Sequence, residues 1–448
     1  MDWSKLPDLV AVALLACAFA SVVRSSHTSV SKLWLTGWIL IAVHFAAFML
    51  TGAQPIWGAV GTTIGLASLI SAGLLFMWAS VPYREEISSQ WMHWTLLCLN
   101  VLYVIVLTSA APAWLLNLVA ILFAVAPLTI ALVFLSSFKN LLRWTTVLLY
   151  CVLAVFLLFT QNRPGSGSDL ALNGVLSTVY LGCAILFWHA YRRATAGAFI
   201  TIAGFFAWSG VFVVAPLLAA FRPQVHLESE VWNLPKYVVA VGMILILLED
   251  QIEHNKYLAL HDELTSLPNR RLFQDRLSNA VARACRLKTQ TALLVIDLNR
   301  FKEVNDTLGH HAGDLVLQRV ASVFAGRVRR SDTVARTGGD EFSVILEEPT
   351  NYAEAESVVR SLMELLVAPI QIEDCAVQIG ASVGIAICPD DATDTESLCR
   401  VADMRMYGDK NSPTGGVNAP GFANAAPRPV FRSPAKDSFN LSPEEEGS

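Results

Sequence analysis

Charge is scarce in this chain, and the scarcity separates it from most soluble proteins. Only 15% of its 448 residues are charged, 54% are hydrophobic, and the formal net charge is -5. Soluble domains carry about 25% charged residues, and nucleic-acid binders usually carry a surplus of basic ones. The composition therefore indicates a large membrane-embedded part and argues against nucleic acid as a partner.

Cysteine is also sparse, and it follows no pattern that binds metal or builds a disulfide framework. The 8 cysteines are scattered along the chain, with no Cys-x-x-Cys pair and no His/Cys cluster. This usage predicts free thiols in a reducing compartment.

A basic leader is missing before the first apolar stretch, and no clear cleavage pattern follows it, so we expect that stretch to be retained as a span. Residues 1–248 contain successive apolar stretches of roughly 17 to 26 residues, long enough to cross a bilayer as helices. We expect an all-α, multi-pass membrane domain with sensory function and about nine helices, or eight if the short last one does not cross. The spans are Leu6–Val23, Leu33–Leu50, Ile56–Val81, Trp91–Ser109, Trp114–Leu135, Trp144–Thr160, Leu170–Tyr191, Ala198–Phe221 and Tyr237–Leu248.

Loop charges orient the spans, because Lys and Arg accumulate on the cytoplasmic side of a membrane. With the N-terminus outside, an odd number of spans places the second half of the chain in the cytoplasm. The inner loops then carry Arg24, Lys32, Arg84, Lys139, Arg143, Arg192 and Arg193. The outer segments carry Lys5, Arg163, Arg222 and Lys236.

Few ionisable side chains fall inside these spans. His44, His93 and His189 are the main candidates for a buried polar function, and for each the alternative is a helix-contact or interfacial histidine. After the last span, residues 249–260 contain no glycine or proline, so we expect them to continue it as a connector helix. Ile252, Leu258 and Leu260 form a short apolar stripe, which suits either pairing with a second copy or a plain connector.

The remainder reads as an α/β domain, with strands and helices in alternation. The Thr265/Ser266 and Pro268 cluster marks the start of the first helix, and Leu298–Asp314 reads as a polar loop. The expected helices are Leu272–Leu287, Leu315–Arg327, Tyr352–Val367 and Thr395–Lys410. The expected strands are Thr291–Asp297, Asp332–Arg336, Phe342–Leu346 and the pair Val377–Ser382 and Val383–Ile387.

Two adjacent acids, Asp340 and Glu341, follow two glycines between strand-like segments. Gly338 and Gly339 permit backbone angles with φ > 0 and leave room for a phosphate beside the main chain. Adjacent carboxylates repel each other unless a cation neutralises them. The turn therefore predicts a metal–nucleotide site.

Four motifs occur in order around this turn. They are His261-Asp-Glu-Leu-Thr-Ser-Leu-Pro-Asn-Arg270, Asp297-Leu-Asn-Arg-Phe-Lys-Glu-Val-Asn-Asp-Thr-Leu-Gly-His-His-Ala-Gly-Asp314, Arg336-Thr-Gly-Gly-Asp-Glu-Phe342 and Ala402-Asp-Met-Arg-Met-Tyr-Gly-Asp-Lys410. Together they resemble a GGDEF-type diguanylate cyclase domain over residues 261–411. The resemblance implies an α/β fold like that of nucleotide cyclases and polymerase palms.

The resemblance implies condensation of two GTP into cyclic di-GMP and two pyrophosphates by a homodimer. It also implies second-messenger signalling, such as biofilm control, from the bacterial inner membrane. Asp297, the carbonyl of Leu298, and Asp340 would hold Mg²⁺ or Mn²⁺. Glu341 would help to bind the metal and take the proton of the attacking hydroxyl.

Substrate contacts are implied by the same resemblance. Asn305 and Asp314 would read guanine, although a turn role for Asn305 and a helix cap for Asp314 are alternatives. The phosphates would meet Phe301, Lys302 and Lys410, with Gly338 and Gly339 admitting them to the backbone. Arg329 and Asp332 resemble an inhibitory product-binding site, or else form a surface ion pair.

The sequence departs from the family pattern at three places. Asn299 stands where an aspartate is frequent, Ser266 replaces a usual glycine, and Asn411-Ser-Pro-Thr-Gly-Gly replaces a basic segment. We expect normal or reduced activity, because the first acids are intact. Residues 412–448 are rich in Pro, Ala, Ser and Gly, which predicts a disordered tail rather than a phosphodiesterase domain.

Two other functions compete with the cyclase. The first is a catalytically inactive receptor for cyclic di-GMP or GTP. The second is a transporter whose membrane half is regulated by the GGDEF domain, which the scarcity of ionisable residues in the spans disfavours.

Overall fold

The computed structural model describes residues 3–25, 29–52, 55–81, 86–109, 111–134, 141–160, 167–191, 195–222, 224, 229–347, 351–372 and 375–410. The chain divides into two compact units, Met1–Glu253 and His254–Ser448. Residues 412–448, for which we expect a disordered tail, lie outside the described residues, as does residue 411.

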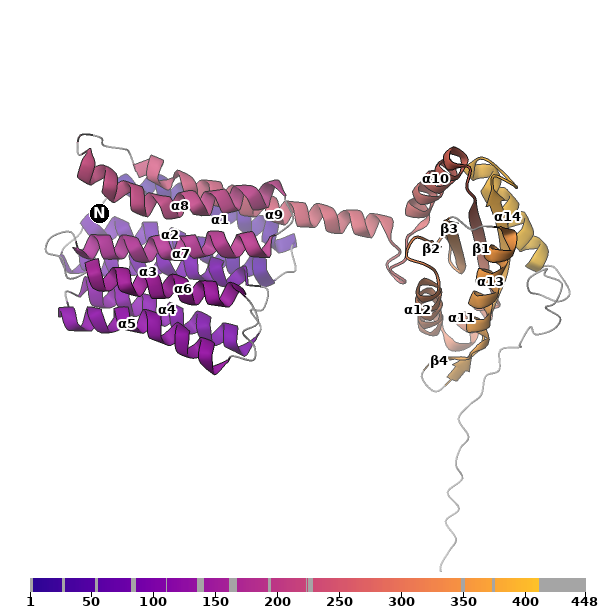
Figure 1. The fold of residues 1–448 in the computed structure, drawn as a ribbon, viewed down its shortest axis with the longest axis horizontal. Helices are drawn as coiled ribbons and strands as arrows, with labels where there is room; N and C mark the ends of the chain where they lie inside the picture. The colour runs from indigo at the N-terminus through magenta and orange to yellow at the C-terminus, as the bar shows by residue number, and fades with distance from the viewer. Residues whose placement is uncertain are drawn as a thin grey trace, which may run out of the picture. The chain divides into compact units, whose positions relative to one another are not determined.

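The first unit consists of long helices that lie side by side with their axes roughly aligned (Figure 1). They are α1 (Leu6–Ser25), α2 (Ser29–Phe48), α3 (Pro55–Ala79), α4 (Ile87–Thr108), α5 (Ala113–Val133), α6 (Leu141–Thr160), α7 (Gly167–Ala190), α8 (Ala196–Phe221) and α9 (Ser229–Leu260), with short 3-10 turns η1 (Trp3–Lys5) and η2 (Met49–Gly52). Each expected span overlaps one of them. Within the described residues, eight helices are long and apolar enough to cross a membrane, and the apolar segment Trp144–Thr160 is shorter.

The last span is longer than the sequence indicated. We expected Tyr237–Leu248, but α9 begins at Ser229 and continues through Pro235 to Leu260, which includes the expected connector. A proline inside an apolar helix is tolerated where neighbouring helices satisfy the freed backbone groups. Lys236, expected in an outer segment, is therefore inside the helix and buried. Of the other loop charges, the side chains of Arg84, Lys139, Arg143, Arg163, Arg192 and Arg193 lie outside the described part.

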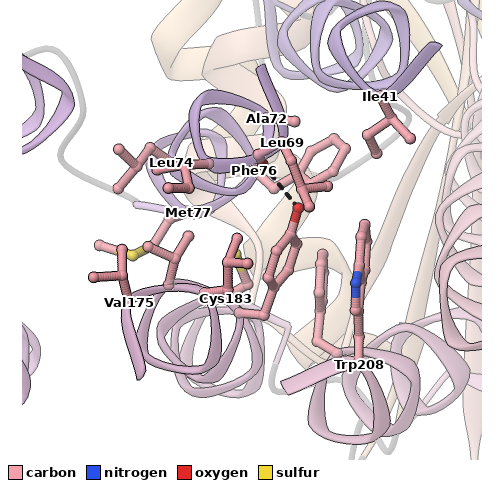
Figure 2. Close-up of a cluster of buried hydrophobic side chains, with 14 of the residues drawn as sticks. Ile41, Leu69, Ala72, Leu74, Phe76, Met77, Val175, Cys183 and Trp208 are labelled. Atoms are coloured by element: carbon pink, nitrogen blue, oxygen red, sulfur yellow. Dashed lines mark hydrogen bonds between the residues drawn. The ribbon is translucent and has the colours of Figure 1, made fainter. Parts of the chain in front are cut away.

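Aromatic side chains from α2, α3, α7 and α8 fill the interior of this unit (Figure 2). The ring centroids of Trp38 and Phe76 are 5.5 Å apart, and those of Tyr180 and Trp208 are 3.9 Å apart. The Tyr180 hydroxyl donates to the carbonyl of Leu69 at 2.9 Å, which the dashed line in Figure 2 marks. These contacts tie helices that are distant in sequence into one bundle.

The three histidines singled out in the spans make helix contacts. His44 Nδ1 is 2.9 Å from the carbonyl of Gly65, and His189 Nδ1 is 2.9 Å from a carbonyl of its own helix. The His93 ring stacks on Trp78 with 4.4 Å between centroids. The contacts agree with the helix-contact alternative for each histidine.

The second unit is an antiparallel sheet with helices on both faces. Its strands are β1 (Thr291–Asn299), β2 (Thr333–Arg336), β3 (Glu341–Glu347) and β6 (Gly380–Cys388), in the order β2-β3-β1-β6. A separate ribbon pairs β4 (Ile370–Ile372) with β5 (Cys375–Val377). The helices are α10 (Arg270–Leu287), α11 (Phe301–Leu308), α12 (His310–Arg327), α13 (Tyr352–Val367) and α14 (Thr395–Lys410).

Alternation along the buried strand β1 builds two cores. Leu294 and Ile296 belong to the core with α12 and α13, whereas Leu293 and Val295 face the core with α10 and α14. Successive side chains of a strand point to opposite faces, so one apolar strand serves both. The central strand is thereby fixed from both sides, and Asp297, near its C-terminal end, is fixed with it.

Three details of this unit differ from the expectations. The first helix begins at Arg270 with Asn269 as its cap, rather than at the Thr265/Ser266 and Pro268 cluster. The expected polar loop Leu298–Asp314 instead contains α11 and the first turn of α12, because Phe301 and Val304 supply an apolar face. The expected strand pair is the single strand β6, since no turn residue separates Ser382 from Val383.

Gly384 in β6 predicts a sharp local sensitivity. A Cβ atom there would lie 1.9 Å from the carbonyl oxygen of Ala402 in α14, whereas one at Gly326 in α12 would meet nothing within 4 Å. In a fragment beginning at Glu249, we expect Gly384→Ala to lower the free energy of unfolding by about 1–3 kcal/mol through overpacking. Gly326→Ala should raise it by about 0.5–1 kcal/mol. Denaturant unfolding measures both, and equal stability of the two variants would contradict the packing of β6 on α14.

Candidate active site

Pairing of β1 with β3 brings the predicted acids together from two separate segments. Asp297 and Glu341 are direct partners in the antiparallel register, and the N–H of Leu298 donates to the carbonyl of Asp340 at 3.1 Å. Directly opposite residues in such a ladder have Cα atoms about 4.5–5.5 Å apart. The sheet therefore holds Asp297, Leu298, Asp340 and Glu341 in one place, as the resemblance predicted.

The two glycines act through space rather than through unusual backbone angles. Among the glycines of the described residues, a positive φ occurs at Gly309, not at Gly338 or Gly339. The expectation of φ > 0 in this turn is therefore wrong. A Cβ at Gly338 would lie 2.6 Å from Glu341 Oε2, so glycine leaves room for that carboxylate.

Lys410 forms an ion pair with Asp297, one of the acids predicted to bind metal. Its Nζ donates to Asp297 Oδ1 at 2.7 Å, with the Asp297 side chain only 9% exposed. The bond and the nearby acids raise the pKa of Lys410, so its ammonium form is favoured. The Asp297 carboxylate is thus paired with an ammonium group in this structure.

The environment of Glu341 opposes its ionisation. Burial raises the pKa of Glu341, and the charges of Asp297, Asp340 and Asp403 raise it further, against a smaller lowering by Lys410. Asp403, on α14, was not among the predicted site residues, although it belongs to the closing motif. Negative charge is thus concentrated where a metal was predicted.

The donor set fits a hard divalent ion completed by substrate. Within the described residues, no group of three or more His, Cys, Asp or Glu side chains could hold a metal by itself. Mg²⁺ is usually bound by one or two carboxylates together with water and substrate phosphates rather than by an all-protein cage. The carboxylates of Asp297 and Asp340 and the carbonyl of Leu298, with Glu341 beside them, suit that mode of binding.

The predicted base-reading residues lie on α11 and α12. Phe301 is buried and Lys302 is exposed, both in the first turn of α11. A Cβ at Gly313 would lie 1.9 Å from Asn305 Oδ1 and 3.2 Å from the Phe301 ring, so the glycine makes room for the Asn305 amide. Asp314 follows Gly313 within α12, whose cap is Gly309, so the capping alternative for Asp314 is wrong.

The opening motif reaches the turn through Arg336, which the sequence reasoning left without a role. Arg336 donates from Nε and Nη2 to the carbonyl of Gly339 at 3.1 and 2.8 Å, and from Nη1 to Asp262 Oδ1 at 2.9 Å. Burial raises the pKa of Asp262, but hydrogen bonds from Thr265 and Arg336 outweigh it and hold the pKa below its usual value. One signal for the roles of these two residues was available in the sequence, because Asp262 lies in the first of the four motifs and Arg336 begins the third.

The same motif also caps α9. Asn269 donates from Nδ2 to the carbonyl of Ala259 and from its backbone N–H to that of Leu260, both at 2.9 Å. The backbone N–H of Arg336 donates to the carbonyl of Pro268 at 3.0 Å. A continuous series of hydrogen bonds therefore runs from the end of α9 to the Gly339 turn.

Two departures from the family pattern have structural explanations. Ser266 has φ = 58°, a left-handed conformation that favours glycine. Asn299 accepts a hydrogen bond from the Ser382 hydroxyl at 3.0 Å, which ties β1 to β6. The third departure, after Lys410, lies outside the described residues.

Arg329 and Asp332 form a local turn. Asp332 accepts from the backbone N–H of Arg329 at 2.9 Å and from that of Glu347 at 3.1 Å. The Arg329 guanidinium, 71% exposed, pairs with Glu354 at 3.3 Å. The carboxylate is thus engaged in the turn, while the guanidinium lies at the surface.

Comparison with known proteins assigns this region to a family. The family described as "Diguanylate cyclase, GGDEF domain" matches residues 259–415. Residues 259–415 are therefore a GGDEF domain.

Relatives with this domain occur in Pseudomonas aeruginosa. The bifunctional diguanylate cyclase/cyclic di-GMP phosphodiesterase MucR is 36% identical over 253 residues, which cover 52% of this chain and 34% of MucR. The diguanylate cyclase TpbB is 44% identical over 161 residues, which cover 36% of this chain and 37% of TpbB. A solved structure of the TpbB GGDEF domain is 44% identical, covering 35% of this chain and 91% of that one, with a TM-score of 0.34. The chain spans about a third of the length of these two curated relatives.

The charge cluster predicts a gain in stability when Glu341 is neutralised. Because the folded-state pKa of Glu341 is raised, its ionised form destabilises the fold above that pKa, and the effect is absent below the unfolded value of about 4.3. Without metal at pH 7, we expect Glu341→Gln to stabilise the fragment by about 0.5 kcal/mol. Thermal unfolding should show a rise in Tm of about 1–3 °C.

The gain should shrink as the pH falls through the folded-state pKa and disappear near pH 4. A gain that is the same at pH 7 and pH 4 would show that charge repulsion is not its cause.

Proposed function

We propose that this chain is a membrane-anchored diguanylate cyclase that condenses two GTP into cyclic di-GMP and two pyrophosphates. The observation that carries the proposal is the register of β1 and β3, which pairs Asp297 with Glu341 inside a GGDEF domain. The diguanylate cyclase activity in the name of TpbB supports it. The fold of the domain is proposed to be that of nucleotide cyclases and polymerase palms.

Asp297, the Leu298 carbonyl, Asp340 and Glu341 would hold Mg²⁺ or Mn²⁺. A bound divalent ion neutralises phosphate charge and makes a coordinated hydroxyl more acidic. Glu341 would accept the proton of the attacking 3′-hydroxyl. The excess of negative charge around Glu341 would favour binding of the metal–nucleotide complex.

Asn305 and Asp314 would hydrogen-bond guanine, and Phe301 and Lys302 would lie beside the phosphates. Lys410 would exchange its bond with Asp297 for a phosphate oxygen when the acid takes a metal. Lys410 ends α14 next to β1, where its long side chain bonds to Asp297 and would also reach a phosphate bound beside that acid. Gly338 and Gly339 would leave the backbone open to the phosphates; Gly338 also leaves room for the Glu341 carboxylate.

The reaction joins two nucleotides symmetrically, so each domain would bind one GTP and a homodimer would be the active species. The membrane half would lie in the bacterial inner membrane as a sensor region, with the GGDEF domain in the cytoplasm. The apolar helices of the first unit support its location in a membrane. A change in α9 would then alter how two GTP-loaded domains meet.

The competing function is a receptor that binds cyclic di-GMP or GTP without turnover. The Arg329 guanidinium, exposed and held by one surface ion pair, favours product binding in either case. The paired acids Asp297 and Glu341 favour catalysis over a purely binding role.

Activity can be measured directly on a fragment beginning at Glu249. Incubated with GTP and Mg²⁺, it should form cyclic di-GMP, which chromatography separates from GTP. Glu341→Gln should lower the rate by at least about 10²-fold, since general-base and metal contributions are lost together. A folded, dimeric fragment that binds cyclic di-GMP and forms none would favour the receptor.

Product inhibition through Arg329 makes a separate prediction. Arg329→Ala should raise the cyclic di-GMP concentration for half-inhibition at least about tenfold, because charge-assisted bonds to phosphate are lost. Arg330→Ala, at the exposed neighbouring position, is the matched control and should not change it. Asp332 is left intact because it caps the turn. Inhibition of Arg329→Ala equal to that of the parent would leave Arg329 as a surface ion pair only.

A further inference from the structure

Three polar side chains are buried where the two ends of the membrane unit's sequence meet. Asp8 belongs to α1, and Asn233 and Lys236 belong to α9; they are 3%, 7% and 7% exposed. Asn233 Nδ2 donates to Asp8 Oδ2 at 2.8 Å, and Lys236 Nζ donates to Asn233 Oδ1 at 2.5 Å. One amide therefore joins a cation to an anion, and we call Asp8, Asn233 and Lys236 the polar latch.

Further contacts fix the latch against neighbouring helices. The Tyr237 hydroxyl donates to Asp8 Oδ1 at 3.2 Å. Lys236 Nζ lies 4.7 Å from the ring centroid of Phe45 in α2 and 5.9 Å from that of Trp208 in α8. An ammonium over aromatic faces gains cation–π attraction. The polar latch therefore contacts α1, α2, α8 and α9 at once, so its geometry depends on how these four helices are placed.

Apolar packing alone does not explain these residues. Ionised side chains within apolar spans are costly, and where they occur they usually mark function. Breaking a buried charged pair costs more than the intact pair contributes, because it leaves an uncompensated charge buried. Opening the latch would therefore carry such a cost at the contact between α1 and α9.

Helix α9 contacts α8 through close backbone packing at glycines. A Cβ at Gly204 would lie 2.8 Å from Val239, and one at Gly242 would lie 2.4 Å from Thr201. Near the end of the span, Glu249 accepts the backbone N–H of Gly197 at 3.2 Å. The backbones of α8 and α9 are therefore in close contact between residues 197–204 and residues 239–249, whereas α9 meets α1 through the side chains of the polar latch.

The same helix, α9, contains two residues of the polar latch and leads into the GGDEF domain. α9 is continuous to Leu260, and Asn269 caps its last carbonyls. We propose that the polar latch sets the position of α9 and that opening it changes the rate of cyclic di-GMP synthesis, an inference that rests on the proposed function. Typical coupling between sites in proteins corresponds to about a 5–150-fold change.

The test uses the full chain reconstituted in lipid nanodiscs. Asn233→Leu removes the bridging amide at nearly constant size. Asn173→Leu on α7 is the matched control, because Asn173 Nδ2 donates to the Asp169 carbonyl of its own helix. Hydrogen exchange by mass spectrometry reports on the first turns of α9, and product formation with GTP and Mg²⁺ reports on output.

We expect Asn233→Leu to raise exchange in residues 229–240 at least tenfold and to shift the cyclase rate at least fivefold, with Asn173→Leu unchanged in both. A second variant, Asp8→Asn with Lys236→Met, removes both charges and should give the same result even if Asn233→Leu folds poorly. In an active chain, faster exchange without a change of rate would overturn the regulatory role, as would no effect on either. An inactive parent chain would instead overturn the proposed function, so the two failures are distinguishable.

Discussion

The rest of the site depends on the antiparallel ladder between β1 and β3. Its register pairs Asp297 with Glu341, and the bond from Leu298 to Asp340 closes the ladder at the turn. A slip of one residue would send these side chains to the opposite face of the sheet. The two apolar cores on either side of β1 prevent that slip, because its side chains are buried alternately in both. The packing of the domain is therefore what concentrates the acids.

That concentration has a physical consequence for the unliganded domain. Glu341 is held near three other acids at the exposed start of β3, and the ammonium of Lys410 offsets only part of their charge. The arrangement places like charges close together, which lowers the stability of the unliganded domain and which the proposed metal would relieve. Arg336 has a related role, since it joins the Gly339 turn to Asp262 in the segment that caps α9. The turn is thereby tied to α9, which continues from the first unit.

Much of this was predictable from the sequence, and the exceptions have identifiable causes. The nine helices of the first unit and the α13 and α14 boundaries follow from apolar length and periodicity, and the gathering of Asp297, Asp340 and Glu341 was implied by the family resemblance. The helices within Leu298–Asp314 were missed because their polar residues outnumber the two apolar ones that pack. Lys236 was assigned to an outer segment because the last expected span began at Tyr237, and Asp8, to which Asn233 links it, lies more than two hundred residues away in sequence. Such pairings depend on tertiary structure, which a local pattern does not report.

The central claim is that the acids paired across β1 and β3 turn over GTP rather than only bind a nucleotide. The most direct measurement is the stoichiometry of the reaction by the full chain in membranes, with GTP consumed, cyclic di-GMP and pyrophosphate all quantified. The account predicts one cyclic di-GMP and two pyrophosphates for every two GTP. Saturable binding of GTP or cyclic di-GMP by the folded chain, without release of pyrophosphate, would contradict it.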